Sequence, residues 1–396
     1  MLRLEEAQER LLARARPAHG EEVELEEALG RVLVDPIVRA PIDVPSFDNS
    51  AMDGFAVRST DTPGELRLAG EVAAGSVEPY RVDPGTAVRI MTGAPLPAGA
   101  DAVIPLEEAD EADAIVRVPA VEPGRFVRRS GDDTTAGSEV HLAGKLGPAA
   151  IAVLASLGIG AVLARRRPVV AILSTGDELV APGVPLRYGQ IYDANAAALA
   201  ASAAEAGAQP DVRARVPDEA SAVEEALKHA CLGADLVVAS GGVSVGRRDH
   251  VRGVLENAGN LDFWRIAVQP GKPLAVGELG GRTIVGLPGN PVSALVTFEL
   301  FVRPFIRATL GLEGDGRLHV RARPDAAIVK DRERRAFLRV IVRQEDGEVR
   351  ARSAGGQGSS QLRPLAEANG LLIVPEGEEA ADPSRDYETI VTGELS

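Results

Sequence analysis

The sequence predicts a multidomain protein that combines α/β and β architecture. Between residues 167 and 312, strand-like apolar runs alternate with helical patterns, which is typical of βαβ units and a largely parallel sheet with helices on both faces. Short strand-like runs broken by Gly and Pro fill residues 43–130 and 313–396 instead. Because 396 residues are too many for one hydrophobic core, these regions are expected to be separate domains.

The start of the chain predicts two helices. The first, over residues 1–16, is amphipathic and places four apolar residues on one side, namely Leu4, Ala7, Leu11 and Leu12. The second is expected over residues 23–33, where acidic residues come early and Arg31 comes late, as the helix dipole prefers. This start lacks the features of a signal peptide, and no run approaches the roughly 18 apolar residues of a membrane span. We therefore expect a cytoplasmic protein with no membrane partner.

The net charge and the cysteine count limit the kinds of molecule that this protein is expected to bind. The formal net charge of −15 argues against a general nucleic-acid surface, because phosphate backbones are held by clustered Lys and Arg. An acidic protein that binds an anionic substrate needs a metal ion, a helix N-terminus or a few placed cations. The single cysteine, Cys231, excludes an intrachain disulfide and a cysteine-cluster metal site, and is expected to be a buried core thiol.

Within residues 167–312 the elements follow in regular order. Strands are expected at 168–173, 211–216, 234–240 and 283–287. Helices are expected at 193–207, 218–230, 248–259 and 291–311. Ligands of such sheets bind beyond the carboxyl ends of the strands. The final region, from residue 313, predicts a small β barrel or sandwich.

Three unusual loops follow strand ends in the alternating region: "STGDEL" (174–179), "SGGVSVGRRDH" (240–250) and "GLPGNPVSA" (286–294). Glycine lets main-chain N–H groups approach a ligand closely, and a following helix N-terminus favours an anion. Pro288 and Pro291 stiffen the last loop, and Pro291 suits the first turn of a helix. One such loop alone is better explained as a plain tight turn. Three on one sheet edge favour phosphate binding.

Carboxylates accompany these loops, at Asp177, Glu178, Asp218 and Asp249. They suit an anion site only if a divalent metal is added, and Mg²⁺ takes one or two carboxylates together with phosphate oxygens. The alternative is that Asp218 and Asp249 cap the helices that follow them, and both roles can coexist. The five histidines show no metal spacing. Only His250 lies near these loops, where a supporting or structural role is expected.

Two further stretches carry polar residues. Lys272 is one of only four lysines and lies in "QPGKP", where the prolines constrain the backbone so that it can hold an oxyanion. An ordinary solvated lysine is the alternative. Residues 45–58 contain Asp48, Asn49, Ser50 and Asp53 in one short run, for which an Asx-rich turn is the alternative explanation.

With these pieces assembled, the chain resembles the molybdopterin molybdenumtransferase (MoeA) family, also seen in the E domain of gephyrin. The resemblance covers nearly the whole chain and rests on motifs in the family's order: "FDNSAMDGFAV", "RIMTGAPLPAGADAVI", "STGDEL", "GQIYDAN", "SGGVSVGRRD" and "GLPGNPVSA". It implies a discontinuous, helical, dimer-forming domain (1–42 and 131–166) with an inserted β-rich domain (43–130). A three-layer α/β molybdopterin-binding domain (167–312) and a C-terminal β barrel (313–396) follow.

The resemblance also implies an activity. The family inserts molybdate into adenylylated molybdopterin and releases AMP with the help of Mg²⁺. The implied assembly is a homodimer whose active site lies between the two subunits, which would bring "AMDG" of one subunit to "SGGVSVG" of the other. Transient contact with molybdopterin adenylyltransferase and with acceptor molybdoenzymes fits this role.

Residue roles carry over where the motif letters match. The implied catalytic residues are Asp53, Thr92, Asp133, Asp249 and Lys272, and the implied metal ligands are Glu178 and Asp249. The substrate-binding set comprises Ser240, Gly241, Gly242, Ser244, Asp218, Arg265, Pro288, Pro291 and Ser359. Many relatives have lysines where this chain has Arg265 and Gln269. Arg265 keeps the charge but not the geometry, whereas Gln269 loses the charge, so Lys272 becomes the favoured cation of this loop.

Two other functions compete with this one. A gephyrin-like binding scaffold needs no carboxylates at the strand ends, so the acidic set argues against it. A molybdopterin adenylyltransferase needs only the α/β domain, so the inserted and C-terminal domains favour the insertion step. Molybdate and tungstate are nearly equal in size and charge, and the sequence favours neither.

Overall fold

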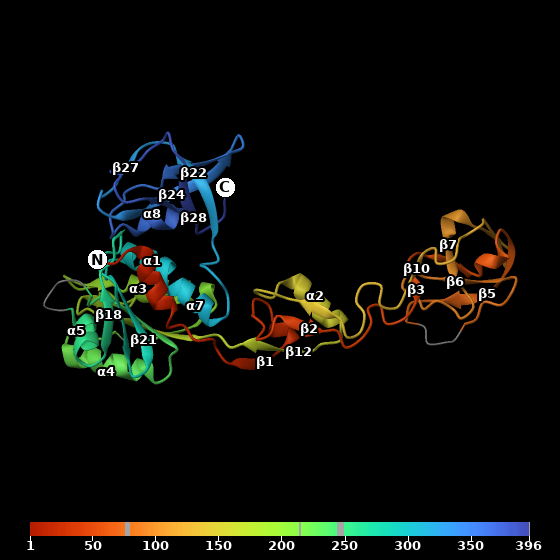
Figure 1. Cartoon of the computed structure of the whole chain (residues 1–396), viewed down its shortest axis with the longest axis horizontal. Coiled ribbons are helices and arrows are strands. Elements are labelled where there is room, and N and C mark those ends of the chain that lie inside the picture. Colours follow the sequence, from red (N-terminus) through yellow and green to blue (C-terminus); the bar gives the residue numbers. More distant parts are fainter. Residues whose placement is uncertain (76–79, 214, 244–248, 396) are drawn as a thin grey trace. The chain divides into compact units, whose positions relative to one another are not determined.

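The computed structural model describes residues 1–75, 80–213, 215–243 and 249–395. They form two compact units, Met1–Gly20 with Arg165–Ser396 and Glu21–Ala164 (Figure 1). The first unit therefore joins the two ends of the chain and the second is inserted between them. No helix of the described ranges is long and apolar enough to cross a membrane. The finer division into four domains stays a prediction.

The first unit contains a six-stranded sheet. Its strand order is β16-β13-β17-β21-β20-β18, with bounds Gln209–Val212, Val169–Ser174, Leu236–Ser240, Arg282–Leu287, Ala275–Leu279 and Asn260–Trp264. The first four strands are parallel, which confirms the predicted parallel sheet. An antiparallel β20 and then β18 extend it at one edge. β16 begins two residues before the strand predicted at 211–216 and overlaps it only at residues 211 and 212.

Helices cover both faces of this sheet, giving the three predicted layers. One layer is α4 and α5, at Ala220–Cys231 and His250–Asn257, and the other comprises α1, α3, α6 and α7, at Leu4–Leu12, Ala194–Ala206, Pro291–Thr297 and Arg303–Thr309 (Figure 1). Val223 and Leu227 of α4 pack with Val237 and Ile284 of the sheet in a continuous buried cluster. Cys231 belongs to this cluster, and burial raises the pKa of its thiol, as expected for a core residue.

The long helix predicted at 291–311 contains a π-helical turn. The turn is η4, Phe298–Val302, between α6 and α7. Pro304 explains it, because proline has no N–H to donate to the carbonyl of Leu300 and its ring crowds that carbonyl. The side-chain Nε2 of Gln8 donates a 2.8 Å hydrogen bond to the Leu300 carbonyl instead. The first helix of the chain therefore satisfies a group that proline leaves unpaired.

A closed β barrel completes the first unit. Its strands run β24, β25, β22, β28 and β26, at Arg335–Glu345, Glu348–Ser353, Leu318–Pro324, Tyr387–Val391 and Gly370–Val374. The barrel closes because β24 pairs with both β25 and β26. β19, Val268–Gln269, adds to the start of β24 from the α/β part. The smaller elements are β14 and β15 (Leu179–Val180, Ile191–Tyr192), β23 and β27 (Ile328–Val329, Ala380–Ala381) and α8 (Leu362–Glu367).

The second unit is rich in β structure. Its six-stranded sheet has the order β7-β4-β6-β5-β9-β8, at Ala102–Pro105, Gly54–Val57, Thr86–Ile90, Gly64–Val72, Ile115–Val118 and Asp110–Ala112. Three separate two-stranded sheets accompany it: β1 with β12 (Gly20–Glu24, Ala161–Arg165), β2 with β11 (Ile37–Arg39, Glu139–His141) and β3 with β10 (Asn49–Ser50, Val127–Arg128). Helix α2, Pro148–Ser156, and the 3₁₀ turns η1, η2 and η3 (Leu25–Glu27, Ser59–Asp61, Leu106–Glu108) complete it.

The helix predicted over residues 23–33 is wrong. This stretch is the end of β1, the short turn η1 and an extended segment. Its backbone bonds distant residues, because the Leu25 amide donates to Gly160 and the Gly30 amide donates to Leu146. Gly30 also has φ +74°, which stops a helix. Strand pairing therefore overrides the local helical pattern.

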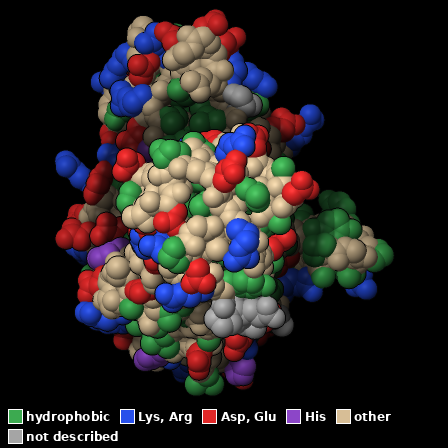
Figure 2. Space-filling view, turned by 90° about the vertical axis from the view of Figure 1, so that its right-hand side faces the viewer, with side chains coloured by type: hydrophobic (Ala, Val, Ile, Leu, Met, Phe, Trp, Pro, Cys, Tyr) green, Lys and Arg blue, Asp and Glu red, His purple; other side chains and the backbone are tan. Residues whose placement is uncertain are grey.

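On the face shown in Figure 2, acidic and basic side chains are interspersed over the coloured surface rather than gathered by sign. This is the pattern of a solvated surface, and it fits the ordinary charged fraction of 26%.

Candidate functional site

The three predicted loops meet at the carboxyl edge of the parallel sheet. Ser174 at the end of β13 is opposite Ser240 of β17, and Ser240 is opposite Leu287 of β21. The Thr175 amide donates a 3.1 Å hydrogen bond to the Ser240 carbonyl, and the Gly241 amide donates a 3.1 Å bond to the Leu287 carbonyl. Backbone bonds therefore continue from loop to loop beyond the strands.

Gly241 and Gly242 form a left-handed turn in which a side chain has no room. Their φ angles are +95° and +68°. A Cβ on Gly241 would lie 2.8 Å from Thr175 Oγ1 and 3.0 Å from the Thr175 carbonyl oxygen, and one on Gly242 would lie 3.1 Å from Val251. Glycine is required here both by conformation and by close approach. Ser244, predicted to extend this turn, lies outside the described residues.

Asn195 joins two of the loops, a role the sequence analysis does not assign. It lies in the first turn of α3, and its Nδ2 donates to Ser240 Oγ at 2.6 Å and to the Gly289 carbonyl at 2.8 Å. The motif "GQIYDAN" ends at this residue, just where Asp193 caps the helix through the Ala196 amide. The sequence signal for this role is a polar residue at the end of a motif, two positions after the residue that caps the helix.

The structure places Ser359 of the barrel region against the proline loop. Asn290 Nδ2 donates a 3.0 Å hydrogen bond to Ser359 Oγ, and the Val292 amide donates a 3.1 Å bond to the Ser359 carbonyl. Pro288 is buried, and Pro291 occupies the first turn of α6 as expected. Ser240, the glycine turn, the proline loop and Ser359 are thus brought together.

The predicted carboxylates lie on three neighbouring loops, with Asp177 and Glu178 on one and Asp218 and Asp249 on one each. Asp177 Oδ1 accepts a 3.1 Å hydrogen bond from the Asp218 amide. His250 Nε2 lies 3.0 Å from the Asp218 carbonyl oxygen and 3.8 Å from Asp218 Oδ1, which links this loop to α5. Asp249 is the N-cap residue of α5, but its side chain makes no capping bond to the described amides of that helix. His250 therefore has the expected supporting position.

These carboxylates bear on Mg²⁺ binding, for which Glu178 and Asp249 are the predicted ligands. Among the residues that the structure describes, no three His, Cys, Asp or Glu side chains are grouped to hold a metal ion. Carboxylate oxygens are hard donors, and Mg²⁺ commonly takes only one or two of them with water and phosphate oxygens completing its shell. The donor set fits a cation bound together with a phosphorylated substrate, rather than a closed protein site.

The cations of the "WRIAVQPGKP" stretch differ in their surroundings. Lys272 is exposed, and its amine makes no hydrogen bond or ion pair with a described residue. Arg265 has φ +73° and its guanidinium carbon lies 3.8 Å from the centroid of the Trp264 ring. Gln269 has a structural role, since its Oε1 accepts a 2.8 Å hydrogen bond from the Asp331 amide.

The second unit brings together two predicted residues that are 39 positions apart. Asp53 Oδ1 accepts hydrogen bonds from the amide and the hydroxyl of Thr92, at 2.6 Å and 2.7 Å. These two bonds hold the pKa of the Asp53 carboxyl below its ordinary value. Gly54 must be glycine, because a Cβ there would lie 2.1 Å from the Ile104 carbonyl oxygen. Asp133 lies on a separate exposed turn, where its Oδ2 accepts a bond from Thr134.

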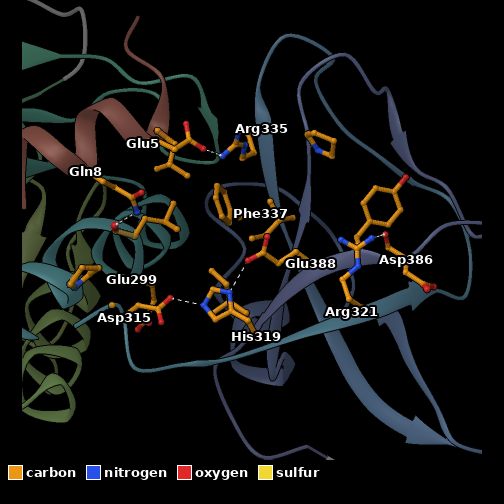
Figure 3. A pocket seen from close by; sticks show the side chains of 18 of the residues that line it. Glu5, Gln8, Glu299, Asp315, His319, Arg321, Arg335, Phe337, Asp386 and Glu388 are labelled. Carbon is orange, nitrogen blue, oxygen red and sulfur yellow. Dashed lines mark hydrogen bonds and ion pairs between the residues drawn. The ribbon is translucent and has the colours of Figure 1, made fainter. Parts of the chain in front are cut away.

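A cavity of about 670 Å³ lies elsewhere in the first unit, between α1, η4 and the barrel (Figure 3). His319 faces carboxylates through both ring nitrogens there, at 2.9 Å from Asp315 and 2.8 Å from Glu388, and Glu5 pairs with Arg335. None of the predicted site residues lines it. The pair of Glu5 and Arg335 connects α1 to strand β24, so these charged groups stabilise the contact between α1 and the barrel.

Comparison with known proteins gives matches along the whole chain. The MoeA N-terminal region (domain I and II) matches residues 2–158, the probable molybdopterin binding domain matches 171–308, and the MoeA C-terminal region (domain IV) matches 321–385. Molybdopterin molybdenumtransferase 2 of Mycobacterium tuberculosis is 41% identical over 369 residues, 89% of this chain and 90% of its own. Molybdopterin molybdenumtransferase of Haemophilus influenzae is 40% identical over 382 residues, 94% of each.

The fold of the whole chain also matches a solved structure. The crystal structure of the molybdopterin biosynthesis moea protein from Pyrococcus horikosii has a TM-score of 0.86 and 34% identity, and it covers 100% of both chains.

Proposed function

Because the chain belongs to the MoeA family of molybdopterin molybdenumtransferases, we propose that it inserts molybdate into adenylylated molybdopterin and releases AMP. The observation that carries this proposal is the meeting of the serine–glycine turn, the proline loop and Asn195 at one sheet edge. Backbone amides and small side chains there suit the pyrophosphate that links the pterin to AMP.

Each group of residues has a separate task. Ser240, Gly241 and Gly242 hold the phosphates, with Pro288, Pro291 and Ser359 forming the wall of the pocket. Glu178 and Asp249 would hold Mg²⁺, which would neutralise phosphate charge when it is bound, and Asp218 would lie beside the phosphates with them. Lys272 and Arg265 supply the remaining positive charge. Cleavage of the bond to AMP depends mostly on such positioning and charge neutralisation.

Asp53, Thr92 and Asp133 act at the end where molybdate enters. Asp53 is fixed by two hydrogen bonds from Thr92, and because these bonds lower the pKa of its carboxyl, the carboxylate stays ionised to a lower pH than an ordinary aspartate. In this proposal the second unit of one subunit serves the α/β part of its partner in a cytoplasmic homodimer. Transient contact with an adenylyltransferase and with acceptor molybdoenzymes belongs to the same proposal.

The test is molybdate-dependent release of AMP from adenylylated molybdopterin. We expect Asp53→Asn to lower the rate by about 100-fold, the scale for a misplaced reacting group. Removal of Mg²⁺ by a chelator is expected to lower it as well, with recovery on adding Mg²⁺ back. Asp110→Asn is the matched control, because Asp110 is an exposed aspartate of β8 in the same unit.

A wild-type protein that releases no AMP in the presence of molybdate would overturn the proposed activity. Full activity of Asp53→Asn would overturn the assigned site, and full activity without Mg²⁺ would overturn the role of the metal. A gephyrin-like scaffold would show no turnover at all, so the same assay separates the two functions.

A further inference from the structure

We propose that Trp264 is a positioning residue that sets the glycine turn and Arg265 for an anionic substrate; this rests on the function proposed above. Trp264 is the only tryptophan of the sequence and the last residue of β18. Its indole Nε1 donates a 2.7 Å hydrogen bond to the carbonyl of Val243. Val243 is buried and directly follows Gly241 and Gly242.

The bond to Val243 fixes one end of the turn. Because both glycines have left-handed φ angles and little steric restraint of their own, the turn needs outside contacts to hold one conformation. Thr175 and Leu287 supply contacts on the sheet side, and Trp264 supplies one after the turn. The indole is a rigid donor, so it holds the Val243 carbonyl at a defined place.

Arginine side chains stack on the same indole. The guanidinium carbons of Arg252 and Arg265 each lie 3.8 Å from the ring centroid. Arg252 also pairs with Glu256 and donates its amide to the Gly242 carbonyl at 3.3 Å. The indole is therefore linked to Val243 by its own hydrogen bond and to Gly242 through Arg252.

Arg265 differs from Arg252 in having no acidic partner among the described residues. Stacking uses the flat face of a guanidinium, whereas its N–H donors lie in its plane. Trp264 can therefore orient Arg265 without consuming the donors that an anion would need. The backbone of Arg265 has φ +73°, and such uncommon conformations gather at functional sites. One side chain thus arranges two substrate-facing groups.

Two substitutions separate these contacts. Trp264→Phe keeps an aromatic face for Arg265 but removes the donor to Val243, and Trp264→Leu removes both. We expect the KM for adenylylated molybdopterin to rise about fivefold in Trp264→Phe, the scale of one hydrogen bond. A further rise of roughly threefold is expected in Trp264→Leu, the scale of a cation–π contact. The kcat is expected to change less than KM in both variants.

Phe298→Leu serves as the matched control, since Phe298 is fully buried in η4, which packs against α1, α3, α6 and α7. It should lower thermal stability, followed by circular dichroism, without raising KM. A second readout is independent of turnover: the Kd of inorganic pyrophosphate, measured by calorimetry, should rise in the same order, Trp264→Phe and then Trp264→Leu.

Unchanged KM and Kd in a folded Trp264→Leu protein would overturn the inference, and so would a rise equal to that in Phe298→Leu. Failure of wild-type protein to bind pyrophosphate would also overturn it, because there would be no anion site to arrange. Pyrophosphate binding that follows the predicted order without any release of AMP would instead overturn the proposed function and leave the role of Trp264 standing.

Discussion

Gly241→Ala tests whether the loops of the site approach one another as closely as the structure shows. The substitution adds one methyl group to a residue with φ +95° and directs it at Thr175, 2.8 Å from the hydroxyl and 3.0 Å from the carbonyl oxygen. Gly281→Ala is the matched control. Gly281 is the turn residue between β20 and β21, has φ +75°, and has open space around its Cβ position.

The magnitudes follow from these two environments. A left-handed conformation costs an L-residue about 1–2 kcal/mol. Alanine recovers about 0.4–1 kcal/mol of this through the lower entropy of the unfolded chain. Gly281→Ala should therefore lower the free energy of unfolding by about 0–1.6 kcal/mol. Gly241→Ala also crowds Thr175, and crowding of this kind costs about 1–3 kcal/mol more.

The assay is urea unfolding followed by the fluorescence of Trp264, which reports on the α/β part because it is the only tryptophan. Gly241→Ala should unfold at lower urea than Gly281→Ala and should also raise the KM for the substrate. Equal losses of stability in the two variants would refute the close approach between Gly241 and Thr175. So would an unchanged KM in a variant that is destabilised as predicted.

Two further predictions concern the α/β scaffold. Asp235→Asn should lower the free energy of unfolding by about 1–3 kcal/mol at neutral pH, because Arg166 donates two 2.7 Å hydrogen bonds to this carboxylate and the Val169 amide donates a third. Burial raises the pKa of Asp235, but these bonds lower it by more. The stabilisation by Asp235 is therefore present above about pH 4 and is lost as acid protonates the carboxyl of the folded protein. A difference in stability between wild type and variant that grows in acid, measured by urea unfolding, would contradict this. Leu227→Ala should cost about 2–5 kcal/mol, because Leu227 is fully buried between α4 and the sheet, and calorimetry showing a loss below that of a surface Leu232→Ala control would count against the described core.

Local pattern predicts the α/β part well because its strands and helices follow one another in the chain. The parallel direction of β13, β17 and β21 follows from alternation, and it places the three loops on one edge of the sheet; the order of the strands comes from the structure. The hairpin of β20 and β21 was also within reach, since Gly280 and Gly281 are typical of a tight two-residue turn. The helix predicted at 23–33 fails because β1 pairs with β12, and no local signal reports a partner so far along the chain.

The site is predictable only in part for the same reason. The roles of Gly241, Gly242 and Pro291 can be predicted from residue type, because glycine frees the backbone and proline restrains it. Asn195 and Trp264 act through contacts with Ser240 and Val243, which lie on other elements, so only the fold reveals them. From the sequence, Asp53 and Thr92 are assigned to one site only because their motifs resemble those of the family. The structure shows that Thr92 donates two hydrogen bonds to Asp53.

The bond from Gln8 to Leu300 connects residues 292 positions apart and has a consequence for biosynthesis. When α1 leaves the ribosome, the helical layer that will bury Leu4, Ala7 and Leu11 has not been translated. At about 5–20 residues per second, the wait lasts roughly 15–60 s. The inserted unit, Glu21–Ala164, emerges whole during that interval and can fold while the nascent chain is still tethered. Helix α1 is therefore made before the inserted unit, but its apolar face is buried only after the later helices have been made.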